Sequence, residues 1–174
     1  MPSITVPDYA GGSLPNLVAE LEARLTGSSA FGRLHTALRD EIPDASTYVL
    51  FLFDGLGSLQ LDHPSAAPLR DALRSNIDSP FPATTTVSLA TVASALPPSQ
   101  HGLLGYQSWI PEIDQVVNTI KWTTLRGTAV DFDTASLLPS PNLWERLTAA
   151  GVEPVTVQPG NFIGTPLSKA LYRG

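Results

Sequence analysis

The stretch Thr47-Tyr48-Val49-Leu50-Phe51-Leu52-Phe53, followed at once by Asp54-Gly55-Leu56-Gly57, decides the fold. The first seven residues are β-branched, aromatic or aliphatic, and polar and apolar positions do not alternate. Such a run is typical of a strand that is buried on both faces, as in a parallel sheet between two layers of helices. The Asp-Gly pair that follows predicts a tight turn at the carboxyl end of this strand.

On either side of this strand, helix and strand patterns alternate. Helices are predicted over residues 14–38 with a break at 27–29, and over 64–75, 84–96 and 142–150; strands are predicted over 116–125 and 152–157. Residues 1–13 are rich in Pro and Gly and are expected to form an irregular arm. The order predicts the α/β class, with a largely parallel sheet in an α/β/α layered arrangement.

Composition narrows the possible functions of this 174-residue chain. Acidic residues outnumber basic ones 16 to 10, and no Lys/Arg cluster is present, so nucleic acid is not an expected partner. The chain has no cysteine, which excludes disulfides, thiolate nucleophiles and iron–sulfur clusters. The N-terminal residues do not form a secretory signal, and the apolar runs are too short to span a bilayer, so a cytoplasmic protein without a membrane partner is expected.

Asp54 is the first candidate functional residue. A carboxylate at the carboxyl end of a buried strand lies where open α/β sheets present their ligands. It could bind a metal, anchor a ligand by a hydrogen bond, or simply form the Asp-Gly turn. The glycines Gly55 and Gly57 do not belong to a dinucleotide-binding fingerprint, because Gln60 stands where the third glycine would be.

The second candidate segment is Phe81-Pro82-Ala83-Thr84-Thr85-Thr86, at the predicted start of a helix. A threonine here could be an ordinary N-cap residue. It could also be a nucleophile, because the positive end of a helix stabilises an alkoxide or a phosphate, provided that a metal or a base activates the hydroxyl. His101, which precedes Gly102, is open to roles as a ligand, a base or a residue that locks a loop.

Together these segments resemble the type I phosphodiesterase/nucleotide pyrophosphatase family of the alkaline phosphatase superfamily. The third matching segment is Leu96-Pro97-Pro98-Ser99-Gln100-His101-Gly102-Leu103-Leu104-Gly105-Tyr106, and the resemblance covers about residues 45–110. It implies an enzyme that hydrolyses a small phosphate ester or a nucleotide with two zinc ions. The expected fold is alkaline-phosphatase-like and incomplete in this chain.

The resemblance also implies roles for individual residues. Asp54 would bind one zinc ion, and Thr85 would be both a zinc ligand and the nucleophile that forms a phosphothreonine intermediate. Thr86 would hold phosphoryl oxygens through its backbone N–H, and Ser88 would contact the substrate where nucleotide pyrophosphatases usually carry an asparagine. His101 matches a histidine that is structural in the family.

Two zinc ions need about six further Asp and His ligands, yet no histidine follows residue 110. Residues 1–174 are therefore expected to be the N-terminal portion of one catalytic domain, inactive alone, with the C-terminal part of the same enzyme as its partner. Self-association through an exposed sheet edge is a further expectation. The alternatives are a non-catalytic α/β binding or scaffolding domain, or a relative of the phosphomutases or of sulfatases with a serine-derived nucleophile.

Overall fold

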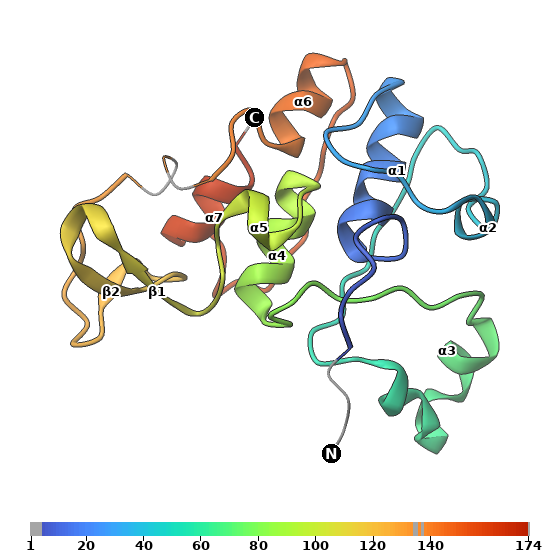
Figure 1. The fold of residues 1–174 in the computed structure, drawn as a ribbon, viewed down its shortest axis with the longest axis horizontal. Coiled ribbons are helices and arrows are strands. Elements are labelled where there is room, and N and C mark those ends of the chain that lie inside the picture. The colour runs from blue at the N-terminus through green and yellow to red at the C-terminus, as the bar shows by residue number, and fades with distance from the viewer. Residues whose placement is uncertain (1–4, 134–135, 137, 174) are drawn as a thin grey trace.

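The computed structural model describes residues 5–133, 136 and 138–173, so the first four residues of the predicted arm lie outside the described part of the chain. Helices form its centre, a small antiparallel sheet lies on one side, and a lobe of short helices lies on the other (Figure 1). The central helices are α1 (Leu14–Thr26), α4 (Thr85–Ser94), α5 (Pro98–His101), α6 (Leu143–Ala149) and α7 (Pro166–Leu171). Short helix α2 (Thr36–Arg39) follows α1.

Local sequence signals determine where the central helices begin and end. α1 starts after Ser13, whose backbone N–H donates to Asn16 Oδ1 at 3.2 Å, and it ends at Gly27 with a φ of +82°. α6 starts at Asn142, whose side chain accepts a hydrogen bond from the backbone N–H of Glu145. The predictions for residues 84–96 and 142–150 are thus confirmed, and the predicted helix over 14–38 is divided into α1 and α2.

Two apolar clusters hold these helices together. The first joins α1, α4 and α6 through Leu14, Val18, Ala19, Ala95, Leu143 and Leu147. The second joins α4 to α7 and to the loops between them through Ala90, Ala93, Leu103, Leu138, Leu167, Ala170 and Leu171. Helix α4 contributes to both clusters, so its position is fixed from two sides.

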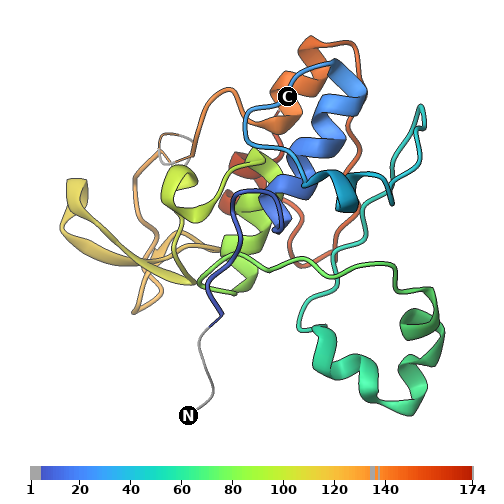
Figure 2. The same ribbon diagram turned by 45° about the vertical axis from the view of Figure 1, so that its right-hand side comes forward.

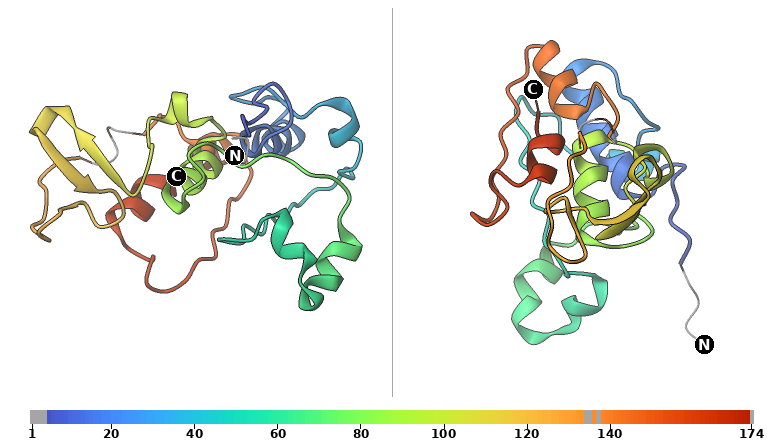
Figure 3. Two further views of the ribbon diagram at one scale, coloured as in Figure 1. Left: turned by 60° about the horizontal axis from the view of Figure 1, so that its bottom comes forward. Right: turned by 90° about the vertical axis from the view of Figure 1, so that its left-hand side faces the viewer.

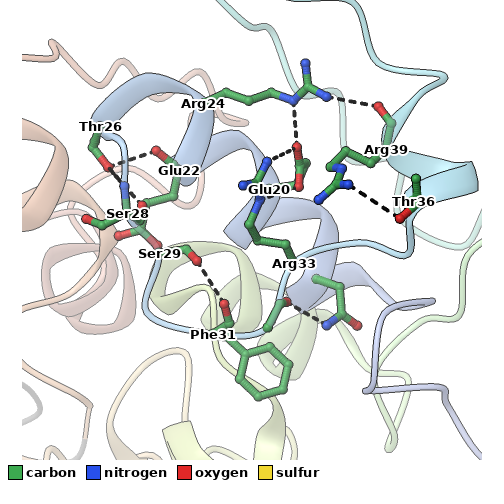
Figure 4. A network of polar contacts seen from close by, with 12 residues as sticks. Glu20, Glu22, Arg24, Thr26, Ser28, Ser29, Phe31, Arg33, Thr36 and Arg39 are labelled. Atoms are coloured by element: carbon green, nitrogen blue, oxygen red, sulfur yellow. Dashed lines mark hydrogen bonds and ion pairs between the residues drawn. The ribbon is translucent and has the colours of Figure 1, made fainter.

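A network of charged side chains attaches the segment after α1 to that helix (Figure 4). Glu20 is fully buried, and its two carboxylate oxygens accept hydrogen bonds from Arg33 at 2.7 and 2.8 Å and from Arg24 at 2.7 Å. Burial alone would raise the pKa of Glu20, but the hydrogen bonds from Arg33 and Arg24 outweigh it and keep that pKa below its usual value. Arg24 also bonds to Asp44 and to the carbonyl oxygen of Arg39, so the network reaches the residues just before the 47–53 run.

The sheet contains β1 (Gln107–Ile110), β2 (Gln115–Asn118) and β3 (Thr123–Thr124), in that order and antiparallel throughout. The 3-10 helix η3 (Pro111–Ile113) connects β1 to β2. Ile110, Val117 and Trp122 form a small separate core under this sheet. The predicted strand over 116–125 is thus two strands of a hairpin-like unit, and Trp122 occupies the turn between them with a φ of +51°.

The predicted parallel sheet is not present among the described residues. Residues 47–53 are extended, but they pair with no strand in the described part of the chain, and Val49 and Phe51 are 73% and 74% exposed. Residues 152–157 are also extended and unpaired there, with Val157 94% exposed. The prediction that the 47–53 run is buried on both faces is therefore wrong for this structure, because no neighbouring strand supplies hydrogen bonds and no helix covers its outer face.

Residues 56–75 form a lobe that two extended segments connect to the helical centre (Figures 2 and 3). The lobe contains η1 (Ser58–Asp62), η2 (Pro64–Ala66) and α3 (Ala67–Ala72), in place of the single helix predicted over 64–75. None of the helices in the described ranges has both the length and the hydropathy needed to cross a membrane.

Candidate active site

The N-terminus of α4 is the centre of the candidate site. Thr84 is extended, with φ −126° and ψ 157°, and its carbonyl oxygen accepts the first helical hydrogen bond, from the N–H of Ser88 at 2.9 Å. The side chain of Thr84 makes no capping hydrogen bond. The first N–H groups of an α-helix have no hydrogen-bond partner inside the helix. At the start of α4, the Thr84 side chain does not accept a hydrogen bond from these groups either.

Asp54 lies at the end of the extended 47–53 run, in the turn that the sequence predicts. The chain turns at Gly55, whose φ of +70° is a backbone conformation that residues with a Cβ rarely adopt. Asp54 is exposed, so its carboxylate is open to solvent as well as to neighbouring side chains.

The structure brings Asp54 and Thr85 together across 31 positions of sequence. Thr85 Oγ1 donates a hydrogen bond to Asp54 Oδ2 at 3.1 Å. Thr85 is half-buried as the first residue of α4. A carboxylate that accepts this hydrogen bond holds the threonine hydroxyl in one orientation.

Thr86 and Ser88 follow on the same helix, and they differ in burial. Thr86 is 1% exposed, and its hydroxyl has no hydrogen-bond partner among the described residues. A buried hydroxyl without a hydrogen-bond partner lowers the stability of the fold, so such groups are uncommon. This one belongs to the residue that follows Thr85. Ser88 is half-buried, one turn of helix further from the N-terminus.

His101 is a structural residue in this fold, as the resemblance implies. It is 1% exposed, its Nδ1 accepts the N–H of Leu103 at 3.1 Å, and its Nε2 lies 3.1 Å from Thr91 Oγ1. Because Nδ1 is an acceptor, the proton of the neutral ring is on Nε2, which donates to Thr91 on α4. His101 therefore fixes the loop after α5 against the middle of α4.

Burial of the ring lowers the pKa of His101 to about 4. In the unfolded chain the pKa of the ring is near 6.5, so between pH 6.5 and 4 the unfolded state binds a proton that the folded state does not bind. We therefore expect the free energy of unfolding to fall, by up to about 3 kcal/mol, as the pH decreases from 6.5 to 4.

Chemical denaturation at a series of pH values measures this effect. His101→Asn should remove most of the pH dependence between 4.5 and 6.5, while His63→Asn, at an exposed histidine, should keep it. Equal slopes for the wild type and His101→Asn across this range would contradict the prediction.

The described residues do not form a complete metal site. No group of three or more His, Asp or Glu side chains in the described part of the chain could hold a metal ion. Each histidine is engaged elsewhere: His101 as above, His35 with Asp8 at 2.8 Å, and His63 with the N–H of Ser65 at 3.2 Å. Asp54 and Thr85 supply two oxygen donors, whereas zinc in proteins usually has four ligands.

A cavity lined by residues close in sequence to Asp54 and Thr85, though not by these two residues themselves, was missed by sequence reasoning. Its volume is about 780 Å³, and its walls include residues 56–58, just after the Asp54 turn, and Phe81 and Ala83, just before α4. In the sequence, the one feature that could have pointed to the cavity is that these residues lie next to the segments that contain Asp54 and Thr85. Their side chains carry no catalytic group, so nothing in the residue types drew attention to them.

Comparison with known proteins identifies the family. The family model described as type I phosphodiesterase / nucleotide pyrophosphatase matches residues 48–169, which is most of the chain and includes both Asp54 and Thr85. Searches of curated proteins and of solved structures found no match. The enzymes for which this family is described are hydrolases of phosphate esters and anhydrides. The chain therefore belongs to the type I phosphodiesterase/nucleotide pyrophosphatase family.

Proposed function

We propose that this chain carries the nucleophile end of the active site of a phosphate-ester hydrolase, with Thr85 as the nucleophile. The observation that carries the proposal is the 3.1 Å hydrogen bond from Thr85 Oγ1 to Asp54 Oδ2 at the N-terminus of α4. Family membership supports the same reaction class. In this proposal Thr85 Oγ1 attacks phosphorus, and its proton moves toward the carboxylate that already accepts it.

The proposed reaction has two steps, and each balances. First, a bond forms between Thr85 Oγ1 and phosphorus while the ester P–O bond breaks, and the leaving alcohol takes up a proton. Second, water attacks the phosphothreonine, which releases phosphate or a phosphate monoester and returns a proton to Thr85. The N–H groups at the start of α4 are suited to bind the phosphoryl oxygens, because they are positive and lack a side-chain cap.

Thr86 and Ser88 are proposed to contact the substrate. The N–H of Thr86 belongs to the first turn of α4, where phosphoryl oxygens would bind, and its buried hydroxyl has no other partner among the described residues. Ser88 offers a shorter hydroxyl where nucleotide pyrophosphatases usually carry an amide. This difference supports a substrate other than a nucleotide.

Zinc is proposed as the metal, with Asp54 and Thr85 as two of its ligands. These two donors alone do not make a zinc site, which usually has four ligands. We propose that the remaining ligands of both ions come from segments other than the described ones. We also propose that residues 1–174 are the N-terminal portion of a single catalytic domain.

A zinc titration tests the donor shortage directly. Two oxygen donors should bind zinc with a dissociation constant no tighter than about 10 μM, far weaker than a four-ligand site. Isothermal titration calorimetry of this chain and of its Asp54→Asn variant measures both affinities. Binding of the wild type tighter than about 0.1 μM would show that the described residues form a site that we have not identified.

Features of the two unpaired segments support an alkaline-phosphatase-like fold with a largely parallel sheet. Residues 47–53 and 152–157 run in the same general direction in Figures 1 and 2. In each segment the odd-numbered positions are the more exposed: Val49 and Phe51 in the first, Val155 and Val157 in the second. Residues 152–157 alternate between half-buried and exposed, which is the pattern of a strand with one covered face, whereas residues 49–53 are exposed throughout. In an α/β/α fold, neighbouring strands and helix layers would cover these apolar side chains.

The exposed segments also predict self-association of this chain. Apolar side chains next to unpaired backbone groups favour pairing with the same segments of another copy. We expect sedimentation velocity at about 100 μM to show species larger than the monomer, and the Phe51→Glu/Val157→Glu variant to remain monomeric. Val6→Glu, at an 83% exposed residue of the arm, is the matched control and should behave like the wild type. A wild type that stays monomeric would contradict this prediction.

Hydrolysis assays test the proposed function. The protein produced from its natural gene and supplied with zinc should hydrolyse bis(p-nitrophenyl) phosphate or p-nitrophenyl phosphate, and it should lose that activity when Thr85 is replaced. Absence of activity on both esters would overturn the proposal and favour the non-catalytic binding or scaffolding domain.

A further inference from the structure

We infer that the organic group of the phosphate ester binds in the 780 Å³ cavity lined by residues that follow Asp54 and precede Thr85, and that this group is uncharged and largely apolar. The inference rests on the proposed function, because it takes Thr85 as the point of attack on phosphorus. It adds the class of substrate that this site accepts.

The position of the cavity links it to the candidate nucleophile. The lobe provides one wall, through Leu56 and Leu61, and the segment that leads into α4 provides another, through Ile77 and Phe81. The first wall begins two residues after Asp54, and the second ends at Ala83, two residues before Thr85. The two walls thus continue the chain from the two residues of the Asp54–Thr85 hydrogen bond, and the inference places the ester substituent along them.

The charge of the cavity disfavours a polyanionic substituent. Asp78 is the one ionisable residue among the lining residues that the structure describes, and its Oδ2 accepts the N–H of Asp8 at 2.9 Å. No Lys or Arg is part of the described lining. Sites for nucleoside di- and triphosphates need cations or arrays of N–H donors for the additional phosphates, and this cavity offers a carboxylate instead.

The size and surface of the cavity suit a medium-sized organic group. Its volume falls within the 300–1,000 Å³ that is usual for small-molecule sites. Phe81 provides an aromatic surface, and Ser58, Ser75 and Asn76 add neutral hydrogen-bonding groups. Such a wall binds an apolar group that carries one or two hydroxyls.

Phe81 is the residue to test, because its ring is the aromatic surface among the cavity's described lining residues. Its N–H donates to Tyr9 Oη at 2.9 Å, which holds the segment independently of the ring, and the residue is 58% exposed. Phe53 is a matched control, since it is 57% exposed and does not line the cavity.

The experiment is a titration of the ¹⁵N-labelled protein, produced from its natural gene and supplied with zinc, followed by amide chemical shifts. The probes are methylphosphonate, (1-naphthylmethyl)phosphonate, 1-naphthylmethanol and ADP. We expect the naphthyl phosphonate to bind at least about tenfold more tightly than methylphosphonate and ADP, and 1-naphthylmethanol to shift amides of residues 56–61 and 77–83. Phe81→Ala should remove the tenfold gain, and Phe53→Ala should retain it.

The outcomes separate the two proposals. If methylphosphonate shifts the amides of residues 85–87 but the naphthyl group adds no affinity, or if ADP binds most tightly, this inference is overturned and the proposed function stands. If 1-naphthylmethanol binds in a manner that depends on Phe81 while neither phosphonate affects residues 85–87, the cavity binds organic groups but the phosphoryl site is wrong, and the proposed function fails.

Discussion

Replacement of Thr85 by alanine is expected to lower kcat for phosphate-ester hydrolysis by at least about 10³-fold, with little change in KM. The reason is that the attacking oxygen is lost, and no neighbouring hydroxyl has the same geometry. Thr85 Oγ1 is the hydroxyl that donates to Asp54, whereas the hydroxyl of Thr86 is buried without a partner among the described residues. Steady-state kinetics of the zinc-supplied protein from its natural gene, with bis(p-nitrophenyl) phosphate, measure the effect.

Two variants serve as controls for this loss. Thr84→Ala removes a hydroxyl one residue away that makes no capping hydrogen bond, so its kcat should stay within about threefold of the wild type. Thr85→Ser keeps a hydroxyl at the same position and should retain measurable activity. After acid quenching of that variant, mass spectrometry should detect a phosphoryl group on the substituted side chain. Equal kcat values for Thr85→Ala and Thr84→Ala would show that Thr85 is not the nucleophile.

Local signals explain why the helices of this chain could be predicted. α6 begins at Asn142 with a reciprocal pair of side-chain caps, and α1 ends at Gly27 in a left-handed conformation. Each of these features involves residues within one turn of helix, so the sequence alone contains the information. The lobe was predicted less well, because Pro64 and Pro68 divide the expected helix over 64–75 into shorter pieces.

The strands could not be predicted in the same way, because a strand is completed by residues far away in sequence. The 47–53 run has the composition of a buried parallel strand, yet Phe51 is 74% exposed in the described structure. Composition determines that the segment is extended, while hydrogen-bonded neighbours and covering helices determine that it becomes a buried strand. The unexpected antiparallel sheet differs, because β1 and β2 are close in sequence and pair across η3 in a register that places Trp109 opposite Val116.

The structure brings two of the predicted site residues together, in surroundings that the sequence did not predict. The family resemblance pointed to Asp54 and Thr85, and the structure places them 3.1 Å apart. The cavity could not be predicted, because the lobe, the N-terminal arm and the segment before α4 meet only in the folded chain. Its walls are ordinary apolar residues such as Leu56 and Phe81, whose types alone indicate no role in binding.

The largest expected effect on stability comes from Arg33, through the buried carboxylate of Glu20. Replacement of Arg33 by leucine removes both hydrogen bonds that Arg33 donates to this fully buried group and leaves Arg24 as its one arginine partner. Leaving a buried charge with too few partners is strongly unfavourable, so the free energy of unfolding should fall by about 3 kcal/mol. Urea denaturation followed by circular dichroism at pH 7 measures the loss, and Arg39→Leu is the control, since Arg39 makes one long side-chain contact of 3.4 Å with Thr36.

The double variant Glu20→Leu/Arg33→Leu separates the cost of a buried charge from the loss of favourable contacts. Once the carboxylate is replaced by an apolar side chain, no buried charge remains to be neutralised, and Arg24 keeps its bonds to Asp44 and to the carbonyl oxygen of Arg39. We therefore expect the double variant to recover more than half of the stability lost in Arg33→Leu. If the double variant were instead less stable than Arg33→Leu, the ion pairs of Glu20 would contribute net stability, and the cost in Arg33→Leu would come from lost attraction between the charges.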